Sequence, residues 1–375
     1  MRYTAIMDYP YRRELEVALR VVEQAARLSQ TVLPDTDKGA VEKEDNLGPV
    51  TIGDFAIQAL LTSSLHAAFP EDMFVGEEDA SALRADAVLC DRVWTTLCET
   101  VDTSSSTGCV LPASSLDMCE AIDRCKNAPG PGRVWVFDPI DGTKTFLRRE
   151  MYAINVALVV DGQQTLSVVA CPLLSPDGGG KNVESEFTNG SVDPTGRGSL
   201  FFAVKGHGAH VRPLFEGKGL GIATGATPRR LSPAVASQPL RPVTCFRLQE
   251  SALDDIHRGI AERLGVVFPG NDLLGWVPRW VLLATGHANT TVWVYRQRGR
   301  HAKIWDHAGA MLLFEETCGV VTDVDGRPID LLAGRTLSKN FGFVAAPTPE
   351  SHALVLQAVH DVLRAKGRLD LLEGN

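Results

Sequence analysis

The chain has 375 residues, of which 44% are hydrophobic and 22% are charged, and its net charge is −9. This composition is typical of a folded globular protein and excludes a disordered one. The length suits one large domain or two medium ones. Because Lys and Arg are spread along an acidic chain, we expect neither a nucleic-acid polymer nor a membrane as the main partner.

The first residues, MRYTAIMDYPYRRELEVAL, contain no apolar run of the kind found in secretory signals. No uninterrupted apolar run elsewhere reaches transmembrane length. The eight cysteines form no CxxC pair and no Cys/His metal spacing. These patterns predict a cytoplasmic protein with reduced thiols.

Residues 11–32 carry apolar side chains at helical spacing and predict an amphipathic helix. We expect a second helix to open at Asp54 and to stop at Pro70. Residues 80–132 are rich in Ser, Asp, Cys and Gly, and we expect them to be partly irregular. The segment VWVF (134–137) predicts a buried strand.

The middle of the chain predicts antiparallel strands. AINVALVV (153–160) and LSVVAC (166–171) flank Asp161-Gly162, a pair that favours a type I′ hairpin turn. By its composition, the stretch 175–198 is expected to be a surface loop. A second hairpin is expected from 200–204 and 208–211.

From about residue 240 short strands are expected to alternate with helices. The strands are expected in VTCFRL, VVF, TTVWVY and FGFVAA, and the helices at 251–264, 276–286, 306–318 and 350–366. Gly319 and Gly367 stand where C-capping glycines belong. The change of pattern predicts two packed lobes, residues 1–225 and 226–375, with a boundary in the Pro/Gly-rich stretch 213–242.

The sharpest local motif is Asp138-Pro139-Ile140-Asp141-Gly142-Thr143, which directly follows the predicted strand. A strand that ends in two aspartates can aim both carboxylates and the Ile140 carbonyl at one point, and hard cations such as Mg²⁺ prefer such oxygen ligands. The N–H groups of Gly142 and Thr143 can then hold a phosphate oxygen. A plain Pro/Asp/Gly turn is the alternative interpretation, but it does not explain why a strand leads into the pair.

Other acidic residues are individually ambiguous. Asp54 stands at a helix start, Glu77 lies in an acidic run, and Asp306 begins the expected helix 306–318. Each could be a solvated side chain or a helix cap. His307, beside Asp306, is more often a packed histidine than a ligand in such a position.

In combination these residues resemble the metal-binding signature of the inositol monophosphatase superfamily. The matching segments are PVTIGD (49–54), VGEED (75–79), WVFDPIDGTKTFLR (135–148) and IWDHAGAMLLFEETCG (304–319). Within that superfamily, Lys144 and the segment 304–307 look like the 3'(2'),5'-bisphosphate nucleotidase branch. The resemblance implies a layered αβαβα sandwich of mixed α+β and α/β character, of the inositol monophosphatase/fructose-1,6-bisphosphatase type.

The resemblance also implies roles for individual residues. The implied ligands of two or three Mg²⁺ ions are Glu77, Asp138, the Ile140 carbonyl, Asp141 and Asp306. Asp54 and Thr143 would orient and deprotonate the attacking water, and Gly142 and Thr143 would hold the phosphate of a small substrate. Inhibition by lithium is a further expectation from the family. The sequence does not indicate the oligomeric state.

Three segments depart from the family pattern. Asp45-Asn46-Leu47-Gly48-Pro49 has Gly where the family has Ser, and Arg247-Leu248-Gln249-Glu250-Ser251 lacks the expected histidine. Arg279-Trp280 replaces a Lys-Tyr pair, and Arg296 is shifted from its expected place. Arg279 and Arg296 could still bind a second phosphate, or they could be surface arginines.

Three functions remain open at this point. The first is hydrolysis of the 3'-phosphate of adenosine 3',5'-bisphosphate or its sulfated relative. The second is hydrolysis of another small phosphorylated metabolite, such as an inositol phosphate or a biosynthetic intermediate. The third is a non-catalytic ligand-binding protein, which the complete set of acidic residues disfavours.

Overall fold

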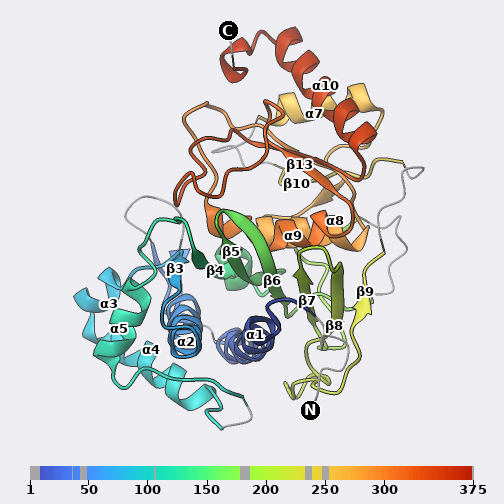
Figure 1. Ribbon diagram of the computed structural model, residues 1–375. Coiled ribbons are helices and arrows are strands. Elements are labelled where there is room, and N and C mark those ends of the chain that lie inside the picture. Colours follow the sequence, from blue (N-terminus) through green and yellow to red (C-terminus); the bar gives the residue numbers. More distant parts are fainter. Residues whose placement is uncertain are drawn as a thin grey trace.

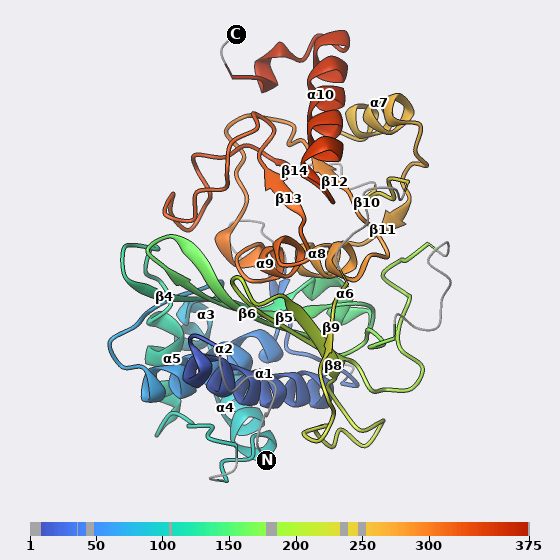
Figure 2. The same ribbon diagram turned by 45° about the vertical axis from the view of Figure 1, so that its right-hand side comes forward.

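A computed structural model describes residues 9–35, 37–42, 49–104, 107–177, 186–232, 239–246 and 253–373. Figures 1 and 2 show that helices and sheets alternate in five layers. The expected αβαβα sandwich is therefore confirmed. From the N-terminal side to the C-terminal side, the layers are α1 and α2, a large sheet, α8 and α9, a small sheet, and α7 with α10.

The large sheet has seven strands in the order β3-β4-β5-β6-β7-β8-β9. The first pair is parallel and each later pair is antiparallel. Its strands are β3 (Met73–Gly76), β4 (Arg133–Asp141), β5 (Ala153–Val160), β6 (Gln163–Cys171), β7 (Ser199–Val204), β8 (Ala209–Pro213) and β9 (Arg229–Arg230). Both expected hairpins are confirmed. Asp161 and Gly162 have φ values of 49° and 78°, as a type I′ turn requires.

The first helical layer agrees with the sequence in part. α1 (Arg12–Val32) forms as predicted, but α2 (Ile52–Ala68) begins before Asp54. Thr51 is its N-cap, and Asp54 accepts the Thr51 backbone N–H at 2.8 Å to complete a capping box. The short strands β1 (Val41–Glu42) and β2 (Pro49–Val50) precede this helix.

The expectation of a partly irregular segment at 80–132 is confirmed for the described residues 101–104, 107–114 and 124–132, but the sequence analysis missed the helices between them. Three helices form there: α3 (Ser81–Ala85), α4 (Ala87–Thr100) and α5 (Ser115–Asp123). The α4 residues Leu89, Val93 and Leu97 are buried at a helical spacing of four. Asp86 and Ser114 cap α4 and α5. The Val, Thr and Cys residues between the buried leucines are poor helix formers, and they concealed this periodicity.

The second half builds the upper layers. Its strands are β10 (Val243–Thr244), β11 (Asn271–Asp272), β12 (Thr291–Trp293), β13 (Val320–Thr322) and β14 (Phe343–Ala346), and its helices are α7 (Asp254–Leu264), α8 (Trp276–Thr285), α9 (Ala310–Glu315), α10 (Pro349–Ala365) and the 3₁₀ turns η3 (Ile304–Asp306) and η4 (Leu369–Leu371). The small sheet has the order β12-β14-β13.

Several predictions for the second half need correction. No strand forms at VVF (266–268), where the chain instead turns toward β11, and the sequence analysis missed β13. The helix expected at 306–318 is interrupted, because Gly309 adopts φ 99° between η3 and α9. Cys318, not Gly319, takes the left-handed conformation after α9, with φ 68°. The division at residue 225 stays a prediction, although β9 still belongs to the large sheet.

The large sheet separates two hydrophobic cores. Val134 and Val136 face one core, to which α8 and α9 also contribute side chains. Trp135 and Phe137 face the other core, to which α1 and α2 contribute. This alternation is the period of two that a strand imposes. Both faces are covered, and for that reason the strands lack a polar side.

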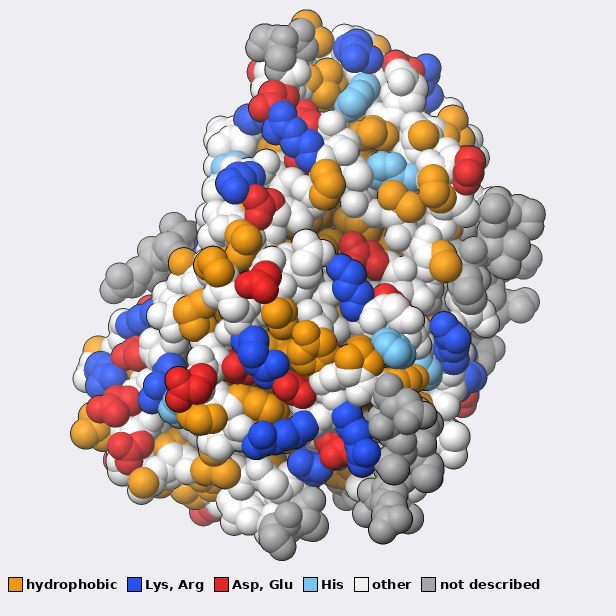
Figure 3. Space-filling model, viewed as in Figure 1, with side chains coloured by type: hydrophobic (Ala, Val, Ile, Leu, Met, Phe, Trp, Pro, Cys, Tyr) orange, Lys and Arg blue, Asp and Glu red, His pale blue; other side chains and the backbone are white. Residues whose placement is uncertain are grey.

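The surface agrees with the spread of charge along the chain. Figure 3 shows acidic and basic side chains interspersed on one face of the molecule, with no single-sign field across it. Among the described residues, no helix combines the length and the apolar character that crossing a membrane requires. The cysteines of the described chain are free thiols.

Candidate active site

Parallel strands bring the first two acidic residues to one edge of the sheet. Gly76 at the end of β3 pairs with Phe137 of β4, so Glu77 and Asp138 follow at neighbouring positions. Gln58 of α2 holds the chain beyond Glu77, because its side chain accepts the Glu78 N–H at 2.9 Å and donates to the Glu78 carbonyl at 2.7 Å.

A β-bulge aims Asp138 and Asp141 at the same side. In a regular strand, residues three apart point to opposite faces. The pairing with β5 advances by three residues on β4 but by only two on its partner, since Asp138 pairs with Asn155 and Asp141 with Ala153. The extra residue restores the common direction. The sequence prediction of a converging pair depends on this bulge, which the motif does not reveal.

Asp306 completes a cluster of three carboxylates. One side-chain oxygen from each of Asp138, Asp141 and Asp306 lies within 4.8 Å of the others. Asp306 arrives at the end of η3, and it does not cap a helix as the sequence analysis allowed. Asn155 of β5 fixes this turn by donating to the carbonyls of Trp305 and Ala308 at 2.7 and 2.8 Å.

Crowding and burial make this cluster electrostatically unfavourable when no cation is present. Burial first, and then the charges of Glu77 and Asp141, raise the pKa of Asp138 well above its usual value. Burial likewise raises the pKa of Asp141 to about 7. The pKa of Asp306 is also raised well above its usual value, by burial and by the charges of Asp141 and Glu77. Divalent cations would offset this repulsion, and carboxylates are the ligands that Mg²⁺ prefers.

Asp54 and Thr143 lie side by side at the margin of this cluster. Thr143 Oγ1 is 3.5 Å from Asp54 Oδ1 and 3.2 Å from the Ile140 carbonyl. Asp54 is fully buried, and its other oxygen accepts the N–H and the hydroxyl of Thr51 at 2.8 and 2.6 Å. One Asp54 oxygen is thus fixed by the capping box, while the other faces Thr143.

The turn after β4 has a conformation that suits glycine. Gly142 adopts φ 88°, which side chains rarely tolerate. A Cβ at this position would lie 2.6 Å from Thr145 Oγ1. The next residue, Thr143, begins the short helix α6 (Thr143–Leu147).

The carboxylate cluster opens into a cavity of about 670 Å³. The predicted site residues that line this cavity are Glu77, Asp138, Ile140, Asp141, Gly142, Thr143, Arg279 and Asp306. Arg296 is exposed and is not one of its lining residues. Residues 45–48 and 247–251, in which the sequence departs from the family pattern, lie outside the described residues. Pro49, the last residue of the first departing segment, is described and lines the cavity.

Two further predicted residues are packed in the interior. Arg279 is 1% exposed, and its guanidinium lies 4.1 Å from the Trp276 ring centre and 4.8 Å from that of Trp293. His307 is fully buried, accepts the Trp280 indole N–H at Nδ1 and stacks on Phe343. Burial lowers the pKa of His307 well below its usual value, so it is a neutral packed histidine.

The sequence analysis missed one wall of the cavity. Tyr295, Arg300, His301, Lys303 and Trp305 line it together with Trp276 and Trp293. The first five of these residues belong to the segment YRQRGRHAKIW (295–305), which follows β12 and runs into η3. The density of cations and aromatic side chains there was a signal in the sequence, but only the fold indicates which of them face the cavity.

Known proteins share both the sequence pattern and the fold. The family model described as the inositol monophosphatase family matches residues 11–364. The chain belongs to this family. A 3'(2'),5'-bisphosphate nucleotidase of Emericella nidulans is 35% identical over 94% of this chain and 99% of that protein. Proteins with the same name from Schizosaccharomyces pombe and Oryza sativa are 33% and 32% identical, over 89% and 96% of this chain and 91% and 97% of those proteins.

Solved structures of the family share the fold at lower identity. The IMPase of Thermotoga maritima superposes with a TM-score of 0.57 at 16% identity, over 94% of this chain and 99% of that one. The suhB protein of Bartonella henselae gives a TM-score of 0.56 at 16% identity, over 92% and 98%. At this identity the likeness describes the architecture alone.

Proposed function

We propose that this family member is a Mg²⁺-dependent phosphatase that removes the 3'-phosphate of adenosine 3',5'-bisphosphate or of its sulfated relative. The observation that carries the proposal is the convergence of Asp138, Asp141 and Asp306 within 4.8 Å at a cavity of about 670 Å³. The relatives at 31–35% identity that carry the name bisphosphate nucleotidase support the choice of substrate.

The donor set suits two or three Mg²⁺ ions. Asp138, Asp141 and Asp306 would bind them, with Glu77 and the Ile140 carbonyl at the same cavity. The pKa values of the three aspartates are raised because their buried negative charges lie close together. A bound cation would offset these charges. When bound, such ions supply positive charge that stabilises phosphate oxygens and activates the nucleophile.

The chain's own residues would position the reactants. The Thr143 hydroxyl, 3.5 Å from Asp54 Oδ1, would hold a water molecule and pass a proton toward Asp54. Asp54 is suited to accept it, because the capping box leaves its Oδ1 facing Thr143. The N–H groups of Gly142 and Thr143 would hold a phosphate oxygen at the mouth of the turn. Arg279 and Arg296 as direct ligands of a second phosphate remain predictions.

A phosphate-release screen tests the proposal. The purified protein with Mg²⁺ would be offered adenosine 3',5'-bisphosphate, inositol monophosphates and sugar phosphates at equal concentrations. We expect the highest kcat/KM with the bisphosphate. A higher value with an inositol phosphate would support the second function considered from the sequence, and no release from any compound would support the non-catalytic one.

The cavity and the cysteines also bear on the partner and the compartment. A small phosphorylated substrate, and not a nucleic-acid polymer, is the partner that a cavity of about 670 Å³ suits. The free thiols fit a reducing compartment such as the cytoplasm.

A further inference from the structure

One arginine side chain fixes the end of the strand that leads to Glu77. Arg335 is half-buried in the loop before β14, and its Nη2 donates to the Gly76 carbonyl at 2.6 Å. Its Nη1 donates to the Cys125 carbonyl at 2.6 Å, and that carbonyl also accepts the Gly76 N–H at 3.1 Å. Because Gly76 is the last residue of β3, these bonds fix the backbone from which Glu77 extends.

The same arginine contacts the turn that carries Asp306. The backbone carbonyl of Arg335 accepts the Ile304 N–H at 2.9 Å, where η3 begins. Its guanidinium lies 4.7 Å from the centre of the Trp305 ring, within the range of a cation–π contact. Ile304 and Trp305 directly precede Asp306, so Arg335 contacts the segments before both acidic residues.

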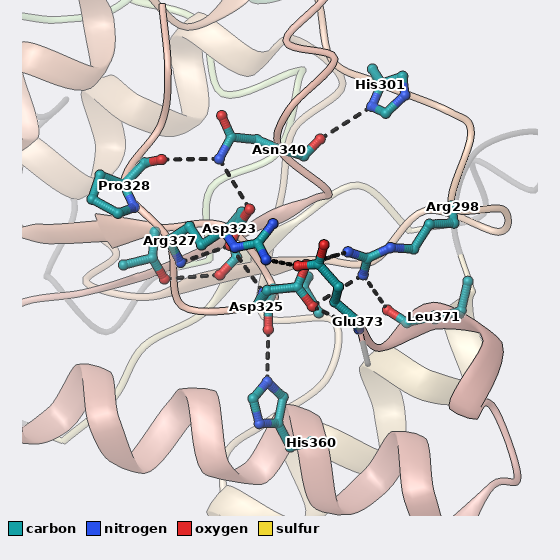
Figure 4. A network of polar contacts seen from close by, with 12 residues as sticks. Arg298, His301, Asp323, Asp325, Arg327, Pro328, Asn340, His360, Leu371 and Glu373 are labelled. Atoms are coloured by element: carbon teal, nitrogen blue, oxygen red, sulfur yellow. Dashed lines mark hydrogen bonds and ion pairs between the residues drawn. The ribbon is translucent and has the colours of Figure 1, made fainter. Parts of the chain in front are cut away.

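The loop that carries Arg335 is anchored by other bonds. Figure 4 shows Asn340 donating from Nδ2 to the Asp323 carboxylate and to the Pro328 carbonyl, each at 3.0 Å. The Asn340 carbonyl lies 3.2 Å from His301 Nδ1. Arg335 is not one of the residues that line the cavity, so it acts on the site through the segments that it holds.

The charge of Arg335 by itself opposes the binding of a cation. Burial lowers the pKa of Arg335, and the charge of Glu77 is among those that raise it. The guanidinium is therefore within electrostatic range of Glu77, where a positive charge repels a divalent cation. A purely electrostatic role predicts that removal of the charge strengthens Mg²⁺ binding. A role in geometry predicts the opposite sign, because residues that orient metal ligands increase metal affinity.

From these contacts we propose that Arg335 is a positioning residue that fixes Glu77 relative to Asp306 and thereby raises the affinity of the centre for Mg²⁺. The inference rests on the proposed function, because it takes Glu77 and Asp306 as metal ligands, and it deepens that function. The two ligands arrive on segments that are far apart in the chain. Arg335 joins these segments through its side chain and its backbone.

Calorimetric titration with Mg²⁺ in the absence of substrate tests the inference. Arg335→Met removes the guanidinium and keeps an unbranched side chain. We expect it to bind Mg²⁺ about 10-fold or more weakly, as is found for residues that orient metal ligands. The Mg²⁺ concentration for half-maximal phosphate release should rise with it. The KM for the substrate at saturating Mg²⁺ should stay within about twofold, because no bond to the substrate is lost. Equal or tighter Mg²⁺ binding by Arg335→Met would refute the inference.

Arg335→Lys provides a second measurement and decides the matter if Arg335→Met does not fold. It keeps the positive charge but lacks the planar fork that bonds two carbonyls at once. We expect Mg²⁺ binding by this variant to be weaker than that of wild type. Wild-type affinity would show that the two-carbonyl contact is dispensable, and the inference would be wrong.

Arg133→Met is the matched control for general destabilisation. Arg133 is also half-buried and also joins separate segments, because it pairs with Asp72 and with Glu14 of α1. It begins β4, at the opposite end of the strand from Asp138. We expect Arg133→Met to lower the melting temperature and to keep the Mg²⁺ affinity. An equal loss of affinity in the Arg133 and Arg335 variants would contradict a specific role of Arg335.

Failure of the proposed function gives a different result. If wild type binds no Mg²⁺ and releases no phosphate, the proposed function is wrong. The positioning by Arg335 is then judged by the hydrogen exchange of residues 73–79 and 301–308. It requires faster exchange of both segments in Arg335→Met than in wild type. Unchanged exchange of either segment would refute it.

Discussion

The carboxylate of Asp141 accepts the backbone N–H of Val277 at 2.7 Å and that of Trp276 at 3.3 Å. A residue of the large sheet thereby caps helix α8 of the next layer. Burial raises the pKa of Asp141, and these two hydrogen bonds lower it by a smaller amount. The same carboxylate belongs to the proposed metal centre, so the packing of α8 on the sheet and the geometry of the centre are coupled.

Gly275 tests this coupling. A Cβ at Gly275 would lie 2.5 Å from Asp141 Oδ2, so Gly275→Ala should displace the carboxylate. We expect weaker Mg²⁺ activation and about 10-fold or greater loss of kcat, since small displacements in an active site are costly. Gly217→Ala is the control, because nothing lies within 4 Å of its Cβ. Equal Mg²⁺ titration curves for wild type and Gly275→Ala would contradict the coupling.

Asp138 should contribute to activity at the expense of stability. Asp138→Asn removes one of several carboxylates whose mutual repulsion raises their pKa values. We expect loss of turnover together with an unchanged or higher melting temperature in EDTA. Mg²⁺ should raise the melting temperature of wild type but raise that of the variant less, because ligand binding stabilises the folded state.

The control for Asp138→Asn is Asp91→Asn, which removes an exposed carboxylate of α4. It should change neither the rate nor the response to Mg²⁺. A fully active Asp138→Asn protein would exclude Asp138 as a metal ligand.

The motif around Asp138 illustrates what a sequence can predict. The buried run VWVF and the residues Pro139 and Gly142 constrain the local backbone, so the strand and the turn after it were predictable. The bulge between Asp138 and Asp141 was not, because it depends on how β5 pairs with β4. Asp306 lies 165 residues after Asp141 in the sequence and reaches the cluster at the end of the 3₁₀ turn η3. Only the family resemblance indicated its place.

Arg279 illustrates the opposite case. Its sequence neighbours suggest either a surface arginine or a phosphate ligand, yet the fold encloses it between Trp276 and Trp293. That arrangement depends on α8 packing against β12, which no local pattern specifies. Arg300 was overlooked for a related reason, since a run of basic residues does not indicate which side chain faces the cavity.

Glu315 should make stability depend on pH. Burial raises its pKa to about 7 from the ordinary value of 4.5, while Lys205 lowers it and Glu316 raises it slightly. Below pH 4.5 the side chain is neutral in both the folded and the unfolded states, and folding incurs no penalty from it. As the pH rises toward 7, the unfolded state ionises first, so stability is lost by up to on the order of 3 kcal/mol.

Glu315→Gln should abolish this loss, because glutamine can still accept the 3.0 Å bond from Gln164 Nε2. Urea unfolding at pH 5 and pH 8 measures the effect. We expect the variant to gain stability relative to wild type at pH 8 and to be close to wild type at pH 5. Glu262→Gln, at an exposed position of α7, should produce no such difference. The same pH dependence in wild type and Glu315→Gln would contradict the assignment.

The ion pair between Glu23 and Arg212 should be a major determinant of stability. It joins α1 to β8, and its side chains are 5% and 0% exposed. Arg212 also donates to the Pro213 carbonyl at 2.9 Å, so the guanidinium remains in place when its partner changes. Glu23→Gln would remove the negative partner of this buried ion pair, and the loss of one partner costs about 3–5 kcal/mol in comparable cases.

Glu16→Gln provides the comparison within the same helix. Glu16 pairs with Arg12 at 2.8 Å, but these side chains are 26% and 41% exposed. Such an exposed pair contributes only about 0.3–0.5 kcal/mol. Denaturant unfolding should therefore show that Glu23→Gln lowers the free energy of unfolding several-fold more than Glu16→Gln does. A Glu23→Gln protein as stable as Glu16→Gln would mean that water reaches Arg212 and solvates its charge in the variant.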